Sequence, residues 1–372
     1  MRSLPRRGLD ERRAADGIVG PMAGGAATVE KAWRQRIEGV VPPDELAALS
    51  QRSLVDTIGL LAVLWVEIIV LLAGANLLPR VADAWAVPLG ILLVVLIATR
   101  INALGVVIHE GSHGFLARSR RLNDRLCNLG AAWWTINSVE EYRPTHRLHH
   151  RYLGEERDPD RPSYRLPDRR GGLAVLILKD LLAVTAVKRA LVLVSGSRDE
   201  EGAETGSSAW KQILLGKSAV QLVVLGQFLL FQGLWRGIAW YVVFWLVPIL
   251  CVYPLILRLK TITEHFDPRF WEDDARLWVA RTSFAGRLQN HLIGARMEYH
   301  FEHHVLPNVP FRGLEELHRR LEDTGWVGQH DEIVSRGYAH FLLGLRKPKR
   351  DERTVLANSS EGPAVTAGDL DG

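Results

Sequence analysis

Apolar and strongly polar segments alternate along this chain. Residues 55–78, 85–108, 213–235 and 238–257 are almost entirely apolar, with only isolated charged or amide side chains. Each stretch is close to the about 20 residues that a helix needs to cross the hydrocarbon core of a bilayer. Short turns separate the first stretch from the second and the third from the fourth. The pattern therefore predicts an all-α membrane protein with four transmembrane helices in two hairpins.

The distribution of basic residues predicts the orientation of these helices. The turns at residues 78–84 and 232–237 contain one arginine each, whereas the N-terminal segment, residues 114–172 and the chain after residue 257 are rich in arginine. Arginine and lysine mark the cytoplasmic side of membrane proteins. We therefore expect a multi-pass protein with both termini and both long polar segments in the cytoplasm. The same rule accounts for the basic excess, so no nucleic-acid partner is expected.

Three segments follow from this pattern. Residues 1–53 form a cytosolic N-terminal segment that is partly disordered, residues 54–324 form the membrane domain, and residues 325–372 form a C-terminal segment ending in a disordered tail. Within the membrane domain, residues 172–194 are apolar but interrupted by charges, which favours an interfacial amphipathic stretch over a fifth span. Residues 312–324 predict a helix with a stripe of leucines on one face.

Eight of the 13 histidines fall into three short clusters with helical spacing. Residues three or four apart lie on the same face of a helix, so each cluster points its imidazoles in one direction. Neutral imidazole is a ligand for iron, zinc and copper. Eight such rings exceed what one tetrahedral ion can use, so their number predicts two metal ions. The clusters are His109 and His113; His146, His149 and His150; and His300, His303 and His304.

The predicted topology allows all three clusters to meet. The first two clusters precede the second predicted hairpin, and the third follows it. Two intervening crossings return the chain to the same side of the membrane. The first cluster also lies at the cytoplasmic end of the second predicted span, so the sequence predicts a metal centre at the membrane surface.

Two functions from other classes are weaker interpretations. His109-Glu110-x-x-His113 also matches the zinc metallopeptidase motif, in which the glutamate is the general base. That reaction needs one more ligand and leaves six clustered histidines unexplained. A metal sensor or transporter is the other alternative, but a transporter places its polar ligands near the middle of the membrane, whereas these histidines flank the spans.

The order and spacing of the clusters, together with the spans, resemble the integral-membrane fatty acid desaturase superfamily over about residues 54–322. The Asp-Pro-Asp run that ends at residue 160 and the residues from His303 to Pro310 add to the resemblance. It implies a cytosolic helical cap that holds a non-haem di-iron centre with two iron ions. It also implies an O2-dependent oxidoreductase that desaturates a fatty acyl chain or lipid by C–H abstraction. The alternative on the same scaffold is a hydroxylase or ketolase of a lipid or carotenoid.

The resemblance also suggests further site residues. It implies that His265 is a ninth iron ligand, and it leaves Asn290 and His291 as possible additional ligands, with a supporting or surface role as the alternative for His291. His318, placed on the polar side of its helix, and His330 and His340 are not expected to bind metal. Carboxylates beside the clusters are expected to accept the second N–H of ligating histidines. These are Glu110, Asp158, Glu264 and Glu302.

The electrons for the reaction are expected to come from a separate protein. Cys127 and Cys251 form no pattern for an iron–sulfur cluster, so a separate ferredoxin or cytochrome-type donor with its reductase is expected. Arginines within and after the second cluster would dock an acidic partner or contact lipid headgroups. They are Arg147, Arg151, Arg157, Arg161 and Arg165. Tryptophans near the clusters would line a hydrocarbon tunnel, or else pack in the core or anchor the interface. They are Trp133, Trp134, Trp271 and Trp278.

Overall fold

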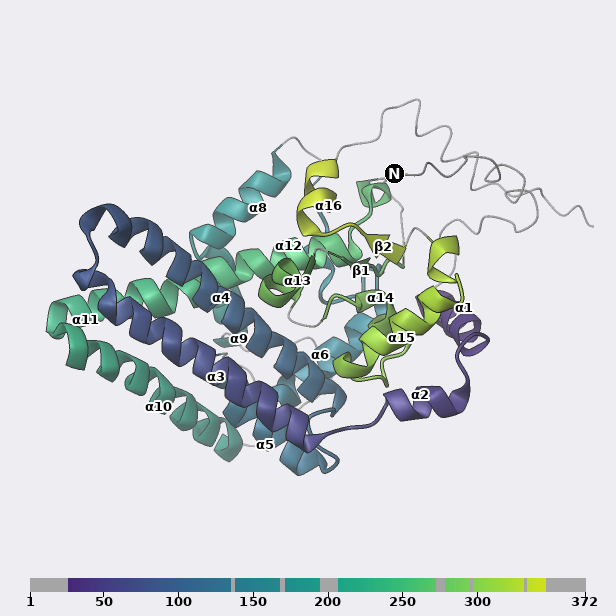
Figure 1. Ribbon diagram of the computed structural model, residues 1–372, viewed down its shortest axis with the longest axis horizontal. Coiled ribbons are helices and arrows are strands. Elements are labelled where there is room, and N and C mark those ends of the chain that lie inside the picture. Colours follow the sequence, from purple (N-terminus) through teal and green to yellow (C-terminus); the bar gives the residue numbers. More distant parts are fainter. Residues whose placement is uncertain are drawn as a thin grey trace, which may run out of the picture.

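A computed structural model gives the fold of this chain (Figure 1). It describes residues 26–134, 138–167, 171–194, 207–271, 278–284, 286–294, 297–330 and 333–345. The predicted disorder of the first residues and of the C-terminal tail concerns residues outside these ranges. Nearly all described elements are helices, and the exception is one pair of short parallel strands, β1 (Thr282–Ser283) and β2 (Val334–Ser335). The prediction of an all-α architecture is therefore confirmed in its main feature.

Three helices among the described residues are long and apolar enough to cross a membrane. They cover Leu54–Arg80, Asp83–His113 and Leu234–His265. The first comprises α3 (Leu54–Leu77) and the turn η1 (Leu78–Arg80), and the second is α4 (Asp83–His113). Helices α3 and α4 pack against each other as an antiparallel pair (Figure 1). Because α4 ends at His113, the first histidine cluster lies at the end of a membrane-length helix, as predicted.

The third long helix is continuous but not regular. It consists of α11 (Leu234–Tyr241), the π-helical segments η3 (Val242–Leu246) and η4 (Pro248–Val252), and α12 (Tyr253–His265). Pro248 and Pro254 lie inside it. Proline has no amide hydrogen and its ring crowds the preceding turn, so wider π-helical turns accommodate it.

Helix α10 (Ser207–Gln232) precedes this long helix and packs along it. Its apolar segment Lys217–Gln232 is shorter than the three membrane-length helices, so the predicted fourth span stays a prediction. The turn to α11 is made at Gly233, whose φ of 75° suits glycine. Gly237 lets the two helices approach closely, because a Cβ there would lie 2.8 Å from Leu229 Cα.

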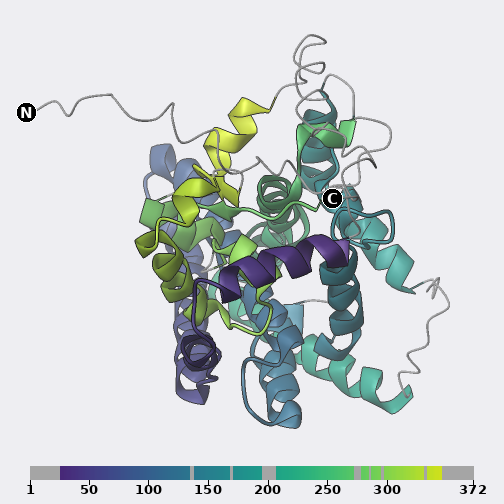
Figure 2. The same ribbon diagram turned by 90° about the vertical axis from the view of Figure 1, so that its right-hand side faces the viewer.

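Most of the remaining helices form a cap at one end of the long helices (Figures 1 and 2). Helix α1 runs across this cap in Figure 2 and contacts α14. The leucine stripe of the predicted helix at residues 312–324 is buried in α15, so that prediction is confirmed. The elements outside the long helices are α1 (Ala26–Glu38), α2 (Pro43–Leu49), α5 (Arg120–Gly130), η2 (Ala132–Trp134), α6 (Val139–Tyr152), α7 (Arg161–Tyr164), α8 (Gly172–Leu181), α9 (Val184–Val194), η5 (Pro268–Trp271), α13 (Gly286–Gln289), η6 (Asn290–Gly294), α14 (His300–Val305), α15 (Phe311–Asp323), η7 (Val327–Gln329) and α16 (Tyr338–Gly344). Of these, α8 and α9 contact η4 in the middle of the third long helix, and η2 packs in the core between the long helices.

The stretch at residues 172–194 folds as two helices rather than one. Helices α8 and α9 meet at Ala183, which has a φ of 58°. Asp180 at this break is fully buried and pairs with Arg258 of α12. A buried carboxylate needs such a partner, so one of the charges that interrupt this apolar stretch has a structural role. Neither helix is among those long enough to cross a membrane.

Candidate metal centre

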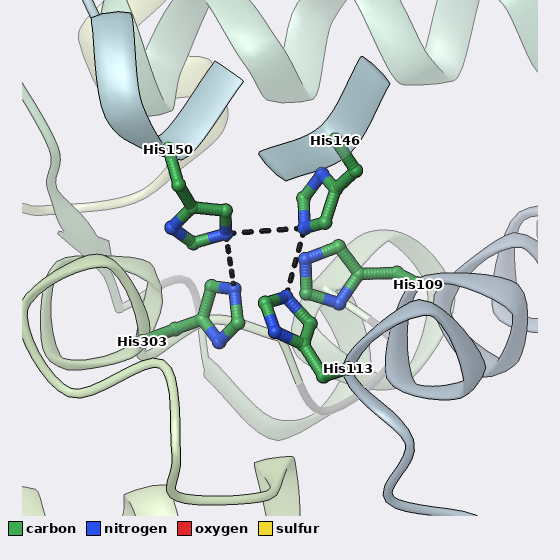
Figure 3. Close-up of side chains that lie close together, drawn as sticks. All are labelled: His109, His113, His146, His150 and His303. Carbon is green, nitrogen blue, oxygen red and sulfur yellow. Dashed lines mark hydrogen bonds between the residues drawn. The ribbon is translucent and has the colours of Figure 1, made fainter. Parts of the chain in front are cut away.

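The structure brings the nine predicted histidine ligands together in two groups. Within each group, one ring nitrogen per histidine lies within 4.8 Å of the others. Figure 3 shows the first group, whose rings face a common centre. We refer to them as the five-histidine group and the four-histidine group. The five-histidine group is His109, His113, His146, His150 and His303, and the four-histidine group is His149, His265, His300 and His304.

The two groups share helices. Helix α6 places His146 and His150, which are four residues apart, in the five-histidine group and His149 in the other. Helix α14 likewise places His303 in the five-histidine group and His300 and His304 in the other. Each of these helices therefore lies between two potential ion positions.

Local sequence signals position the ends of these helices. A capping box begins α6: Ser138 Oγ accepts from the Glu141 amide at 3.3 Å, and the Glu141 carboxylate accepts from the Ser138 amide at 3.0 Å. Helix α4 ends directly after His113 because Gly114 adopts a left-handed conformation with a φ of 82°. The histidines thus occupy the last turns of α4 and the body of α6.

The ring nitrogens in each group face one another at short distances. In the five-histidine group, His146 Nε2 lies 2.9 Å from His113 Nε2 and 3.1 Å from His150 Nε2. In the four-histidine group, His300 Nε2 lies 2.9 Å from His265 Nε2. The His265 Nδ1–H donates to the Val279 carbonyl at 2.9 Å, so its Nε2 presents a lone pair to the group. Two ring nitrogens this close share an N–H···N hydrogen bond, whereas four or five that converge can all present lone pairs only to a cation. The donor set in each group therefore fits a metal ion.

Burial keeps most of these imidazoles neutral. The pKa of each of five cap histidines is held well below the ordinary value of 6.5, first by burial and then by the charge of neighbouring histidines. Neutral imidazole is the form that binds a metal. The electrostatics of the cap therefore favour a metal-binding state at neutral pH. The five are His146, His150, His300, His303 and His304.

His149 is the exception, and its partner explains why. Burial alone would lower its pKa, but the Asp158 carboxylate and the charge of Asp160 raise it. Asp158 accepts from His149 Nδ1 at 3.0 Å, from the Tyr164 hydroxyl at 2.6 Å and from the Asp160 amide at 2.8 Å. Such a carboxylate fixes the tautomer and orientation of a ligating histidine. Asp158 therefore lies beside a clustered histidine, and its role as support for a metal ligand stays a prediction.

Two tyrosines in this environment were missed by the sequence analysis. Tyr164 supports Asp158, and the sequence gives no signal for it. Tyr142 places its hydroxyl 3.3 Å from His146 Nδ1. It lies four residues before His146 on α6, so helical spacing could have indicated this contact.

The other three carboxylates do not act as expected. Glu110 Oε1 lies 3.6 Å from His109 Nδ1, beyond hydrogen-bond distance, while its Oε2 accepts from the Phe311 amide at 3.0 Å. Glu264 pairs with Lys260 at 2.7 Å and lies 3.8 Å from the inward-facing His300 Nε2. In neither case does the carboxylate accept from an outward-facing imidazole N–H.

The prediction for Glu302 is wrong. Its carboxylate binds the Thr282 hydroxyl and His318 Nδ1, neither of which belongs to a histidine group. At about 100° per residue, position 302 points away from the neighbouring histidines of α14. The placement of His318 on a polar helix face is also wrong, because its ring is buried against Glu302 on the same face of α15 as the leucine stripe.

His291 lies in neither group. It belongs to η6, where Arg100 of α4 donates to its carbonyl at 2.8 Å and also binds Glu67 at 2.8 Å. Asn102 donates to the Ile293 carbonyl, also at 2.8 Å. The polar residues that interrupt the apolar helices α3 and α4 therefore hold η6 against α4. Asn290 is the first residue of the same segment.

The remaining histidines and tryptophans occupy packing positions. His330 packs against Trp326 with ring centroids 4.4 Å apart, and His340 is exposed, so both lie outside the two groups. Trp133 stacks on Trp245 at 5.1 Å inside the membrane-helix core, which favours packing over tunnel lining. Trp134 packs against Tyr253, and Trp278 meets the ring of His304 edge-on at 6.5 Å. The side chain of Trp271 is outside the described part of the structure.

The fold and the site define a class: a helical protein in which two membrane-length helices end at two adjacent groups of histidines that could hold metal ions. The family model described as fatty acid desaturase matches residues 52–327. The chain belongs to the fatty acid desaturase family and is an oxidoreductase.

Two relatives show the range of reactions among similar proteins. Dihydrorhizobitoxine desaturase of Bradyrhizobium elkanii is 26% identical over 268 residues, which cover 69% of this chain and 74% of that protein. Zeaxanthin 4-ketolase of Chlamydomonas reinhardtii is 27% identical over 215 residues, covering 56% of this chain and 40% of that protein. These similarities support desaturase-like oxidation at a membrane.

Proposed function

We propose that this protein is an O2-dependent desaturase that introduces a double bond into a fatty acyl chain or lipid. Two iron ions would be held by the nine histidines, one by each group. The observation that carries this proposal is the separation of nine histidines, six of them buried, into two adjacent groups on shared helices. A single zinc site would not need the second group.

The zinc peptidase alternative also lacks its general base. The buried Glu110 carboxylate is committed to the backbone amide of Phe311. Both histidines of the motif also converge with three others, whereas that mechanism needs only one further ligand.

The residues of the chain would orient the iron ligands and exclude water during oxidation of the C–H bond. When bound, the two irons would relay electrons from the external donor to O2 and so provide the oxidant needed to break an unactivated C–H bond. Asp158, fixed by Tyr164, orients His149. Burial of the cap histidines keeps water away from the reacting atoms, which prevents side reactions.

The membrane arrangement completes the proposal. We infer four spans in two hairpins, with α10 as the third span and the histidine groups and termini in the cytoplasm. The antiparallel pairs α3–α4 and α10–α11 support this arrangement, and so do the arginine-rich polar segments (Figure 1).

A separate ferredoxin or cytochrome-type protein with its reductase would supply the electrons. Arg147 and Arg151 are exposed on α6, the helix that contributes to both histidine groups, and Arg165 is exposed shortly after it. These charges suit an acidic donor, and the short path through α6 suits electron transfer into the site.

The second candidate is a hydroxylase or ketolase acting on a lipid or carotenoid. The similarity to a protein named zeaxanthin 4-ketolase favours keeping this candidate.

Mass spectrometry of lipids from a host expressing the chain with a ferredoxin and its reductase separates the two candidates. A product lighter by two hydrogens supports desaturation. A product heavier by one oxygen supports hydroxylation, and one that gains an oxygen and loses two hydrogens supports ketolation. The His303→Ala variant should abolish whichever product is formed. The matched His330→Ala variant should retain it, because His330 lies outside both groups. Iron analysis should give about two ions per chain, and zinc in their place would overturn the proposal.

A further inference from the structure

A long apolar groove separates α3 from α10 away from the histidine groups. Its cavity volume is about 680 Å³, and its walls come from these two helices and from Trp245. Val223 and Phe231 at its rim are 70% and 67% exposed, so the groove is open toward the surrounding bilayer. No residue of the two histidine groups lines it.

The groove is apolar along most of its length and polar at one end. From Trp65 to Asn76 it follows α3 for about 16 Å at the helical rise of about 1.5 Å per residue, which is close to the thickness of one leaflet. At Asn76 the lining becomes polar. There Asn76 Nδ2 donates to Gln227 Oε1 at 2.7 Å, while the buried Gln227 Nε2 has no acceptor within the described part of the chain.

Arg80 ends the polar side of the groove. It is exposed, and no carboxylate lies within salt-bridge distance of it among the described residues. Arg80 follows α3, whereas His113 ends the antiparallel helix α4, so the two residues lie at opposite ends of the helix pair. In the proposed topology, Arg80 therefore lies at the headgroup level of the leaflet opposite the histidine groups.

We propose that this groove binds one phospholipid of that leaflet. One acyl chain would lie between α3 and α10, and the phosphate would contact Arg80, since arginine matches phosphate geometry. The Gln227 amide would face the ester region. The stacked rings of Trp133 and Trp245, together with Trp65 beside Trp133, close the inner end, which favours a resident lipid over a substrate passing to the histidine groups. This inference rests on the membrane topology of the proposed function and not on its reaction.

The test is native mass spectrometry of the full-length protein released from nanodiscs that contain phosphatidylglycerol. Wild type should retain one phospholipid per chain. Ala73→Trp, which fills the groove, should lose at least tenfold in occupancy. Val63→Trp is the matched control, because Val63 is a lipid-facing α3 residue that is 55% exposed and lies outside the lining. It should retain the lipid.

Two further comparisons test the contact between Arg80 and the lipid phosphate. Arg80→Gln should weaken retention at least tenfold, whereas Arg236→Gln, an exposed arginine in the other hairpin turn, should not. Diacylglycerol, which has the same chains without the phosphate, should bind at least tenfold more weakly than phosphatidylglycerol. Equal retention by Ala73→Trp and wild type would overturn the proposal.

Measuring turnover distinguishes a resident lipid from a substrate in the groove. Ala73→Trp should retain iron and product formation, because the groove is separate from the site. If the variant keeps its iron but loses turnover, and free fatty acid displaces the phospholipid, the groove is a substrate channel and the proposal is wrong. Lipid retention does not depend on the reaction, so failure of the proposed desaturation would leave this result interpretable.

Discussion

Replacing Asp158 with asparagine should selectively weaken the four-histidine group. The Asp158 carboxylate accepts three hydrogen bonds, from His149, Tyr164 and the Asp160 amide. An amide has one accepting oxygen, and its NH2 group would face at least one of these donors. A hydrogen bond to a charged group is worth about 1.5–3 kcal/mol, and loss of such a partner typically costs about 10–100-fold in metal affinity.

The assay is iron content and affinity of the purified protein in competition with a chelator. Wild type should hold about two irons, and Asp158→Asn should lose one of them about 10–100-fold more readily. Mössbauer spectra should show that a single iron environment changes, because the five-histidine group does not contact Asp158. Glu156→Gln is the matched control, since Glu156 lies in the same segment and its side chain is 78% exposed. Two irons with unchanged affinity in Asp158→Asn would refute this reasoning.

Three further predictions concern packing, the membrane helices and pH. Gly237→Ala should lower the free energy of unfolding by about 1–3 kcal/mol, because the new Cβ meets the α10 backbone. Gly226→Ala is the control in the same thermal melt, and it should be neutral or stabilising because the space around Gly226 is open. Arg100→Met should speed hydrogen exchange in η6 without lowering iron content, because the hydrogen bond to the His291 carbonyl is lost; unchanged exchange would contradict this role. In the metal-free protein, the free energy of unfolding should fall as the pH drops below about 6.5. The five cap histidines have a lower pKa in the folded protein than in the unfolded chain, so the unfolded chain binds more protons in this range and is favoured. Each contributes up to about 1.4 kcal/mol per pH unit, and a melting temperature that does not change from pH 7.5 to 5 would be incompatible with neutral buried rings.

The structure also changes the interpretation of polar residues in apolar segments. Glu67 and Arg100 are interruptions in the hydropathy pattern, but they form a pair at 2.8 Å and hold η6 in place. Asp180 has a comparable role through Arg258. Such residues are tolerated in apolar surroundings because each has a partner.

The sequence by itself determined the features that depend on local periodicity and composition. The apolar stretches predicted the long helices, and the 3- and 4-residue spacing of the histidines predicted that each cluster faces one way. The leucine stripe of α15 followed from the same rule. These properties depend on residues within a few turns of one another, so they can be read without knowing how the helices pack.

Only the tertiary structure decided how the clusters divide. His149 and His150 are adjacent in sequence yet belong to different groups, because α6 lies between two centres formed with other helices. The same packing brings His318 of α15 against Glu302 of α14. Both outcomes depend on the direction in which separate helices approach one another, and hydropathy and spacing along a single helix carry no information about that direction.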